Sequence, residues 1–552
     1  MTSKSTSIFL ISVMILCCVL PANAQKKGME SITADELRAH LNFIAADEFE
    51  GRNTPSPGLK ICSRYLAAFV ESYGFKPLMP DGSFYQEIPL EVTSISETKT
   101  RLRVIADMSE QVFYFPQAFG GRFRSSGTFS GDVVFVGYGL NASEQGWDDY
   151  GDVNLEGKVV VMLDGQLPDD HELRMRENRR ILSAGRSVPR TKGAAAVLTV
   201  INVERENDMA SSGIVFSNSQ SVSMTGSFET QSTARRRSSQ QAPQQPAQAQ
   251  PQRPFLPFIQ AEIRHDVAAA ILGVTKSELN DMFAMISSGV QVPMKELPDK
   301  RVELTVSIDR RPAITQNVVA VLEGSDPELK NEYVVIGAHH DHLGIRNGEV
   351  LNGADDNGSG TVALLEIAQA MIIERPKRSV VLVWHTGEEK GLFGAHYFAN
   401  NCPVPVEKIS ANINLDMLCR NDPDSLYLIA SDMLSTELDT VIHEMNNEYI
   451  KLNFDYIYND RSHPDRFYYR SDHYPYLRFG IPSVWFFCGT TPDYHQPTDT
   501  VDRVDFIKME RVTRLAYLTA YESGNKEELL KLDANPEVTT RGKHNLSVES
   551  IK

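Results

Sequence analysis

Cysteine is scarce in this chain, with six residues in 552. Cys17 and Cys18 belong to the amino-terminal segment treated below, which leaves four for the rest of the chain: Cys62, Cys402, Cys419 and Cys488. Thiols that are so few and so far apart exclude a disulfide framework as the basis of the fold. They leave room for one bridge, which the sequence does not assign.

Basic residues are outnumbered, with 55 Lys and Arg against 72 Asp and Glu, which gives a formal net charge of −17. Broad binding to nucleic acid or to anionic membranes needs a basic surface, so both are excluded as general functions. Small molecules and peptides remain as partners, and oligomerisation stays open. With 41% hydrophobic residues the chain is typical of globular proteins, and its length predicts two or more domains.

The amino terminus lacks an apolar run long enough to span a membrane. The run Ile8–Leu20 is shorter than the ~20 residues that a spanning helix needs, and it follows Lys4 and precedes Ala22-Asn23-Ala24. This pattern predicts a signal peptide over residues 1–24, cleaved near Gln25, and therefore export to the periplasm or the extracellular space without stable membrane insertion. Cys17 and Cys18 raise lipoprotein anchoring as an alternative, but Leu16 before them fits a lipid-attachment site poorly.

The next segment, 25–119, has helical spacing of apolar residues in its first half and is predicted to be the amino-terminal part of a larger domain. Over 120–301 the pattern changes to short β-rich runs separated by glycine turns, which predicts a separate inserted module. Within it, 231–254 is rich in Gln, Pro, Ser and Arg and is predicted to be a disordered loop. A third segment, 302–525, completes the larger domain, and 526–552 is a carboxy-terminal tail.

The segment from residue 302 alternates apolar runs and helical patterns. Strands are predicted at Asn317–Leu322, Tyr333–Ala338, Val380–Trp384, Ala411–Leu415 and Ile481–Phe487, and helices at Thr361–Ile373, Leu392–Asn400, Ser435–Asn446 and Phe506–Tyr521. Continuous apolar runs without strict alternation are typical of strands covered on both faces. The pattern therefore predicts a three-layer α/β/α domain.

Histidines and carboxylates gather where these predicted strands end. They are His339 and Asp341, Glu388 and Glu389, Asp416, and His495, with the pair Asp355-Asp356 in a glycine-rich stretch after the first of them. In open α/β sheets the carboxyl edge of the strands is where ligand sites are built. A set of imidazole and carboxylate ligands without a thiol is typical of catalytic zinc. Because there are several carboxylates for two histidines, one carboxylate could bridge two metal ions.

Alternation along a strand places His339 and Asp341 on one side and His340 and His342 on the other. A histidine ligand commonly has a carboxylate that orients its second nitrogen, and Asp341 would do this for His339. His340 and His342 are therefore expected to be satisfied by backbone or solvent. The adjacent Glu388 and Glu389 divide naturally into a general base and a ligand.

Five motifs of this region occur in the order of a known family. They are His339–Asp341, Gly353–Gly360, Gly387–Gly394, Asn414–Met417 and Tyr494–Thr500. Together they resemble the co-catalytic di-zinc aminopeptidases, which include secreted bacterial leucyl aminopeptidases and, with an inserted domain, glutamate carboxypeptidase II and the transferrin receptor. The order Gly137–Gly139, Trp147–Tyr150, Leu155–Val160 and Lys192–Ala195 resembles the protease-associated domain that such peptidases carry.

The resemblance implies a zinc exopeptidase domain of α/β class with a mostly β protease-associated insertion, and two Zn²⁺ per chain. It makes His339, Asp356 and Asp416 the ligands of one zinc, and Asp356, Glu389 and His495 those of the other. Asp341 corresponds to the residue that orients the first histidine, Glu388 to the general base and Tyr494 to a tyrosine that donates to the oxyanion. The implied activity is removal of amino-terminal residues from peptide substrates.

Other polar residues near these motifs have ordinary structural explanations. Asp355, Asn357, His385, His396 and His443 are expected to be turn-forming or satisfied residues. Asp472 in Ser471-Asp472-His473 is expected to shape the pocket or brace its loop. Arg466 and Arg470 either bind a substrate carboxylate or pack on the surrounding aromatic side chains.

Three alternatives to an aminopeptidase remain. Binding of a substrate carboxylate by the arginines would make the chain a carboxypeptidase or a dipeptidase. A receptor-like binding module without catalysis is disfavoured because Glu388 and all five ligands are present. Glutaminyl cyclisation with one zinc is disfavoured by the full two-metal ligand set.

Overall fold

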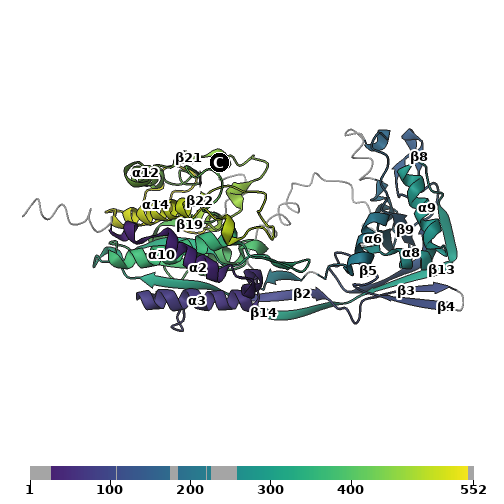
Figure 1. The fold of residues 1–552 in the computed structure, drawn as a ribbon, viewed down its shortest axis with the longest axis horizontal. Helices are drawn as coiled ribbons and strands as arrows, with labels where there is room; N and C mark the ends of the chain where they lie inside the picture. Colours follow the sequence, from purple (N-terminus) through teal and green to yellow (C-terminus); the bar gives the residue numbers. More distant parts are fainter. Residues whose placement is uncertain (1–26, 107–108, 175–184, 219, 226–257, 545–552) are drawn as a thin grey trace, which may run out of the picture. The chain divides into compact units, whose positions relative to one another are not determined.

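The computed structural model describes residues 27–106, 109–174, 185–218, 220–225 and 258–544 (Figure 1). These residues form two compact units. The first takes the described parts of Met1–Leu90, Val222–Pro243 and Pro312–Lys552, and the second those of Glu91–Ser221 and Gln244–Arg311. The predicted signal peptide 1–24 and the predicted loop 231–254 lie outside the described residues, so both stay predictions.

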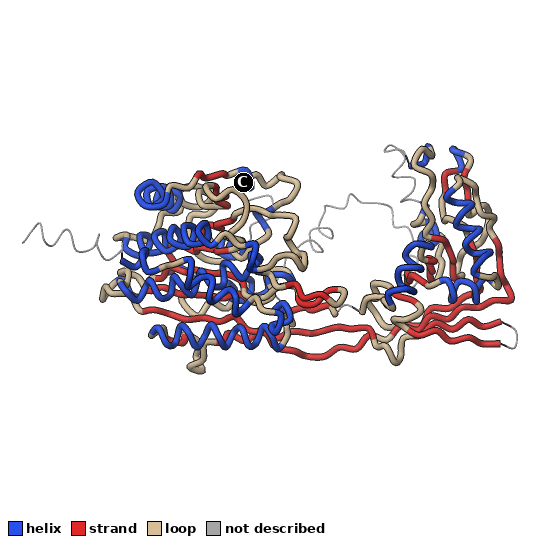
Figure 2. Tube along the Cα trace, viewed as in Figure 1, coloured by secondary structure: helices blue, strands red, loops and turns tan. Residues whose placement is uncertain are grey.

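A mixed sheet lies among the helices of the first unit (Figure 2). Its strand order is β11-β2-β14-β18-β15-β19-β22-β20-β21, with β1 beside β14. Its four strands β18, β15, β19 and β22 are mutually parallel, as a doubly covered α/β sheet requires. The strands are β1 Lys76–Pro77, β2 Tyr85–Ile95, β11 Ser221–Met224, β14 Ile308–Leu322, β15 Tyr333–His339, β18 Ser379–His385, β19 Ile409–Leu415, β20 Ser425–Ile429, β21 Asn453–Asp455 and β22 Ser483–Phe487. A small hairpin follows β15, formed by β16 Gly344–Arg346 and β17 Glu349–Leu351.

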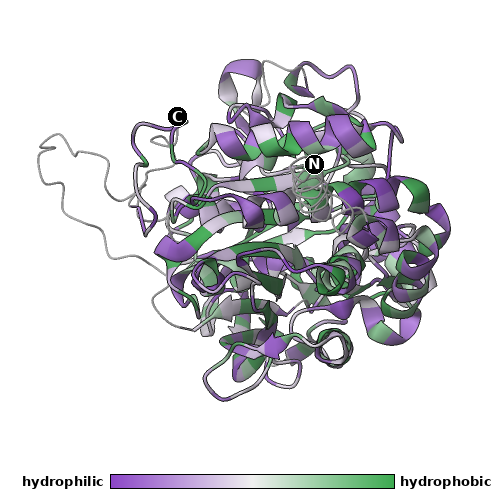
Figure 3. Ribbon diagram, turned by 90° about the vertical axis from the view of Figure 1, so that its left-hand side faces the viewer, coloured by the Kyte–Doolittle hydropathy of each residue, from purple (hydrophilic) through white to green (hydrophobic). Residues whose placement is uncertain are grey.

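Helices cover both faces of this sheet. Val334 and Ile336 of β15 pack in one core with helices of the first layer, whereas Val335 between them packs with the second layer. The first layer holds α2 Ala34–Ile44, α3 Pro57–Tyr73, α10 Gly360–Ile373, α12 Thr436–Met445 and α14 Phe506–Asn525, and the second holds α11 Phe393–Asn400 and α13 His473–Leu477. The predicted three-layer α/β/α domain is confirmed. The ribbons of the helices carry hydrophilic and hydrophobic residues in alternation, as expected for helices with one face on a core (Figure 3).

Capping contacts fix the ends of the amino-terminal helices α2 and α3. The Thr33 hydroxyl accepts the Glu36 N–H at the start of α2, and Ser56 caps α3 in the same way, with Pro57 as its first residue. Gly74 ends α3 at φ 96°, a left-handed conformation that glycine adopts without steric cost. Between these helices, residues 45–56 pass close to the site described below.

The second unit has its own sheet, ordered β4-β3-β13-β6-β9-β10-β12-β5. It begins at Glu91 rather than at residue 120, because β3 and β4 pair with each other and β3 pairs with β13. Its sheet strands are β3 Arg101–Ala106, β4 Ser109–Tyr114, β5 Phe119–Gly120, β6 Gly127–Phe135, β9 Val159–Leu163, β10 Ala196–Val200, β12 Ile259–Ile263 and β13 Lys295–Val306, with β7 Asn141–Ala142 and β8 Trp147–Asp148 as a separate pair. The second unit also contains helices, which a mostly β module does not predict. They are α5 Val188–Thr191, α6 Val203–Ser212, α8 His265–Leu272 and α9 Lys276–Ser287.

The carboxy-terminal segment packs on the first unit as far as it is described. Leu530 and Val538 are buried, and the Arg541 guanidinium donates to the Ile409 carbonyl at 2.6 Å. Cys62, Cys402, Cys419 and Cys488 are all free thiols in the described structure. Among the described helices none combines the length and apolar character needed to cross a membrane.

Candidate metal centre

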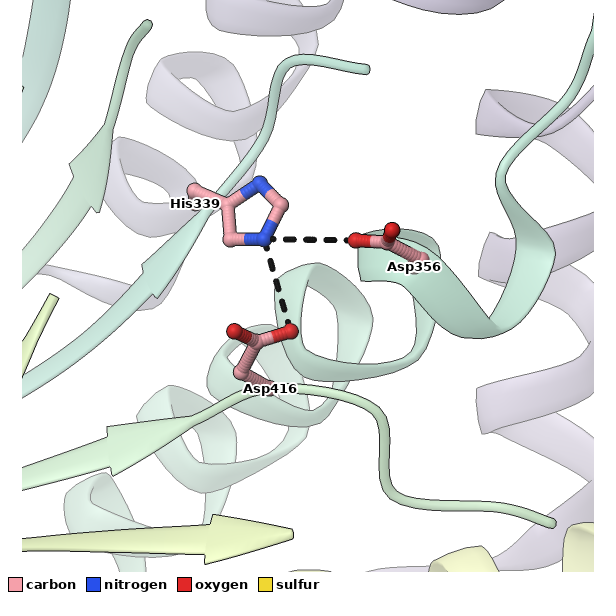
Figure 4. A group of neighbouring side chains, drawn as sticks. All are labelled: His339, Asp356 and Asp416. Carbon is pink, nitrogen blue, oxygen red and sulfur yellow. Dashed lines mark ion pairs between the residues drawn. The ribbon is translucent and has the colours of Figure 1, made fainter. Parts of the chain in front are cut away.

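Three buried side chains from separate elements meet beyond the carboxyl end of β15 (Figure 4). His339 is the last residue of β15, and its Nε2 lies 3.5 Å from Asp356 Oδ1 and 3.4 Å from Asp416 Oδ1. Asp416 directly follows β19, and Asp356 lies in the turn before α10. We call these three residues the first ligand group; they offer one nitrogen and carboxylate oxygens from two residues.

A second set of side chains gathers on the other oxygen of Asp356. His495 Nε2 lies 3.0 Å from Asp356 Oδ2 and 3.4 Å from Glu389 Oε2. His342 Nδ1 lies 2.9 Å from Glu389 Oε1 and 3.9 Å from Asp356 Oδ2. His342, Asp356 and Glu389 offer atoms within 4.8 Å of one another. We call these three residues and His495 the second ligand group, which shares Asp356 with the first.

Local backbone geometry presents Glu388 and Glu389 to this site. They begin a single turn, Glu388–Lys390, bounded by Gly387 at φ 67° and Gly391 at φ 113°. A side chain at 387 would be strained by that φ, and its Cβ would lie 3.0 Å from the Cβ of Phe393. His495 itself has φ 59°, a conformation that is rare for a residue with a side chain and concentrates at functional sites.

Burial and charge displace the pKa values of these side chains. Burial raises the pKa of Glu388 well above its usual range; His339 opposes the shift, and nearby carboxylates including Glu389 add to it. Burial also raises the pKa of Glu389, against His495 and His339. For His339 burial acts to lower the pKa, but the charges of Asp416, Glu388 and Asp356 outweigh it, so the pKa is raised. A site with this excess of carboxylate favours a positive ion.

Asp341 is placed differently from the sequence prediction. Its carboxylate is 3.8 Å from His339 Nδ1, and the nearer contact of that nitrogen is the Asp341 backbone carbonyl at 3.2 Å. The carboxylate instead accepts the Glu388 N–H at 3.1 Å and the Thr54 hydroxyl at 3.0 Å. Burial raises the pKa of Asp341 to about 6. Asp341 therefore joins the His339 segment to the Glu388 turn.

Tyr494 stacks on the imidazole of His495, with 3.8 Å between the ring centroids. Its hydroxyl oxygen accepts a hydrogen bond from Arg470 Nη2 at 2.9 Å, and burial raises its pKa. Since the oxygen accepts from Arg470, the phenolic hydrogen is left to point elsewhere. Arg470 also lies over the ring of Phe467, and Arg466 lies over that of Tyr469, so both arginines pack on aromatic side chains.

The histidine His340 has the environment that was expected. Its Nε2 contacts the Ser63 hydroxyl at 2.9 Å and its Nδ1 the His385 carbonyl at 2.7 Å. His385 and His443 each contact a tyrosine hydroxyl, those of Tyr476 and Tyr456. His396 is buried, and no described residue hydrogen-bonds its Nε2.

The polar neighbours of the motifs also have mainly structural contacts. Asp355 accepts the Cys419 N–H and thiol at 3.2 and 3.0 Å, and Asn357 donates to the Leu415 carbonyl. Asp472 is buried next to the first ligand group, where burial raises its pKa. Its carboxylate oxygens lack a hydrogen-bond partner within the described ranges, so no brace is observed.

His342 departs from the expectation. Strand β15 ends at His339, so the alternation that would turn His342 away does not extend to it. Its imidazole is fully buried and faces Glu389 rather than backbone or solvent. The one signal in the sequence is the histidine itself. It lies three residues after His339 and therefore outside β15.

Four supporting residues were also not assigned a role from the sequence. Arg52 is fully buried and donates to four backbone carbonyls, including those of His340 and Gly353, which lie on either side of the site loop. Asp499 accepts the N–H groups of Asp355 and Asp356 at 3.0 and 3.1 Å. Ser471 donates to Asp416 Oδ2 at 2.6 Å, and Thr54 holds Asp341. Arg52 and Thr54 come from a turn that lies far from the motifs in sequence and so gave no signal.

The atoms of both groups fit metal ions. In the part of the chain that the structure describes, His342 Nδ1, Glu389 Oε1 and Asp416 Oδ1 are buried and have no hydrogen-bond partner. Such unsatisfied atoms are costly unless a ligand takes them up. A donor set of imidazole and carboxylate without thiolate is that of catalytic zinc.

Comparison with known proteins gives a match to the model of Peptidase family M28 over residues 317–520. An "Aminopeptidase" of Pseudomonas aeruginosa strain UCBPP-PA14 is 36% identical over 138 residues, which are 25% of this chain and 24% of that protein. A "Probable leucine aminopeptidase" of Arthroderma otae is 27% identical over 209 residues, 36% of this chain and 55% of the relative. The chain thus spans a quarter to about half of the length of these relatives.

Among solved structures, the aminopeptidase from Aneurinibacillus sp. strain AM-1 aligns with a TM-score of 0.49 and 17% identity, over 92% of this chain and 98% of that one. The matched range 317–520 contains the five motifs and both ligand groups. Within this chain, residues 317–520 are thus similar to peptidase family M28.

Proposed function

We propose that this chain is a zinc-dependent aminopeptidase that binds two zinc ions. The observation that carries the proposal is the pair of ligand groups that share Asp356, one oxygen of which faces each group. The family match and relatives named as aminopeptidases support the same activity. Export, as the amino-terminal 24 residues predict, forms part of the proposal.

His339, Asp356 and Asp416 would hold one zinc, and Asp356, Glu389 and His495 the other. Bound zinc supplies a Lewis acid that polarises the scissile carbonyl and lowers the pKa of water. The side chains that hold no metal then have the tasks of moving protons and orienting the substrate.

Glu388 is the proposed general base. Its raised pKa suits a group that takes a proton from the attacking water and returns it to the leaving amine. The hydrogen bond from its backbone N–H to Asp341, which follows the strand of His339, keeps the turn in register with the first ligand group.

Tyr494 is the proposed donor to the oxyanion. Arg470 donates a hydrogen bond to the hydroxyl oxygen of Tyr494. The phenolic hydrogen of Tyr494 can therefore be directed at the carbonyl oxygen of the substrate, on which charge develops. Stacking on His495 fixes the ring beside the second ligand group.

An exopeptidase for free carboxyl termini is the second candidate, since Arg470 is exposed and near the site. The Tyr494 contact and the packing of both arginines on aromatic rings favour the aminopeptidase. A panel of peptides with blocked amino or blocked carboxyl ends decides between them. Cleavage only of substrates with a free amino end supports the proposal, and a requirement for a free carboxylate contradicts it.

The metal dependence has a separate test. Dialysis against a chelator should abolish hydrolysis of aminoacyl anilides, and zinc should restore it. Metal analysis of the restored protein should give two zinc ions per chain. Full activity without metal would contradict the proposal.

A further inference from the structure

The stretch after β15 places two neighbouring imidazoles in opposite environments. His340 and His342 are both fully buried. Both ring nitrogens of His340 have polar contacts, to Ser63 and to the His385 carbonyl. For His342 the described residues provide no hydrogen-bond partner to either nitrogen.

The unsatisfied Nδ1 of His342 faces an equally unsatisfied oxygen. It lies 2.9 Å from Glu389 Oε1, yet the two atoms do not meet hydrogen-bond geometry and each lacks a partner within the described structure. The same nitrogen is 3.9 Å from Asp356 Oδ2. Ligands at about 2.0–2.1 Å from a tetrahedral zinc lie about 3.3 Å from one another. The two distances lie on either side of that separation, so one ion could take up the lone pairs of these atoms.

The backbone holds His342 in this position from two directions. Its N–H donates to the Arg52 carbonyl at 3.1 Å, and His342 forms a bridge with Asn53. On the other side Gly353 approaches closely, since a Cβ at 353 would lie 2.5 Å from Cγ of the imidazole. Gly353 also has φ 57°, so both its backbone conformation and the lack of space for a Cβ favour glycine. The ring is therefore clamped with its Nδ1 toward the carboxylates.

We infer that His342 is a protein ligand of the second ion, in addition to Glu389, His495 and the shared Asp356. The inference rests on the proposed function, because it assigns a residue to the metal site of that function. It adds an imidazole to the set implied by the family resemblance, in which His495 is the sole nitrogen ligand of that ion.

An additional imidazole makes the two groups unequal. The first group has one nitrogen donor, His339, whereas the second has two, His342 and His495. Nitrogen donors favour zinc over Mg²⁺, Ca²⁺ and Mn²⁺, which prefer oxygen. The second group is therefore expected to take the first zinc equivalent and to retain it longer against a chelator. The first group is expected to exchange its ion more easily.

X-ray absorption of the wild-type protein with one zinc equivalent tests the inference without any substitution. Scattering from imidazole rings counts the histidines on the ion. Two imidazoles per zinc are expected, because the first equivalent enters the second group. An average of one imidazole per zinc, at one equivalent and again at two, would overturn the inference, because neither ion would then have two nitrogen ligands.

Two variants measure the same point by affinity. His342→Gln is expected to weaken one of the two zinc sites by more than about 100-fold in chelator competition, a larger loss than the 10–100-fold typical of residues that only orient a ligand. His340→Gln is the matched control, with a neighbouring buried imidazole that has its own hydrogen bonds, and it should keep both affinities. Circular dichroism with excess zinc checks that each variant is folded.

Rescue of an alanine variant by free imidazole distinguishes a metal ligand from a residue with a structural role alone. His342→Ala should regain zinc affinity at that site when free imidazole is added, and imidazole should not change the wild-type affinity. Unchanged affinity in His342→Gln, or a loss below 100-fold without imidazole rescue of His342→Ala, would overturn the inference. If the wild type itself binds no zinc, the proposed function fails; if it binds two and His342→Gln does so equally well, this inference alone fails.

Discussion

The two ligand groups are built in different ways. The first uses residues at the ends of the parallel strands β15 and β19, and His339 and Asp416 are almost fully buried there. The second uses loop residues: Glu389 from a turn between two left-handed glycines, and His495 at φ 59° with 29% of its side chain exposed. The sheet sets the geometry of the first group, whereas strained loops held by their surroundings set that of the second.

The exposed side of the site therefore lies at the second group. Tyr494 stacks on His495 there, and Arg470 reaches it from an aromatic loop. A peptide would approach along this side, since the first group is closed in by β15 and β19. Under the proposed function, the difference separates a group enclosed by the sheet from one that is open to the substrate.

The largest effect is expected from the residue that the two groups share. Asp356→Asn keeps the shape but removes the charge that both groups use, so zinc should be lost and kcat/KM should fall by about 10³-fold or more, the several kcal/mol that a metal supplies. Metal analysis and anilide hydrolysis check this. Asp355→Asn is the control, because Asp355 is outside both groups; two zinc ions retained in Asp356→Asn would contradict the shared role.

Removing the base should separate chemistry from metal binding. Glu388→Ala is expected to keep two zinc ions and lower kcat by 10²–10⁴-fold, the usual contribution of a general base. Glu389→Gln should instead lose zinc from the second group, although it is the next residue. The pair is compared by metal content and by kcat. A Glu388→Ala variant that loses metal would show that Glu388 is a ligand instead.

The first group was the easier to predict from sequence. Periodicity predicted β15 and β19, whose ends put His339 and Asp416 at the same edge of the sheet. The second group depends on φ values at Gly387 and His495 and on the point at which β15 ends, none of which a hydrophobic pattern specifies. The alternation of side chains along β15 therefore does not extend to His342, which lies three residues beyond the strand and faces Glu389.

Support from distant segments was beyond prediction for another reason. Arg52 and Thr54 reach the site from the turn between α2 and α3, almost 300 residues before it in the chain. Only the packing of that turn against the site loop reveals them. The inserted module shows the same limit, since its strands were anticipated but the helices α8 and α9 were not.

A smaller effect should follow from loosening the first group alone. Ser471→Ala removes the hydroxyl that donates to Asp416 Oδ2 at 2.6 Å, and outer contacts of this kind typically contribute 10–100-fold to metal affinity. One zinc site should weaken by that factor while the other is unchanged, as measured by chelator competition. Ser483→Ala is the control, because the Ser483 hydroxyl on β22 donates to the Ile481 carbonyl and not to a ligand. Equal weakening of both sites would mean that the two groups do not act separately.

The smallest effect is expected at the exposed edge of the second group. Arg470→Gln removes a charged donor from the Tyr494 hydroxyl; a net hydrogen-bond contribution of about 0.5–1.5 kcal/mol corresponds to a 2- to 13-fold loss of kcat, with zinc content unchanged. Because Arg470 would act through Tyr494, the loss should vanish in a Tyr494→Phe background, which a double-mutant cycle measures. It should also be equal for substrates with free and with amidated carboxyl ends. A loss confined to free carboxylates would instead make Arg470 a carboxylate receptor and shift the assignment toward a carboxypeptidase or dipeptidase.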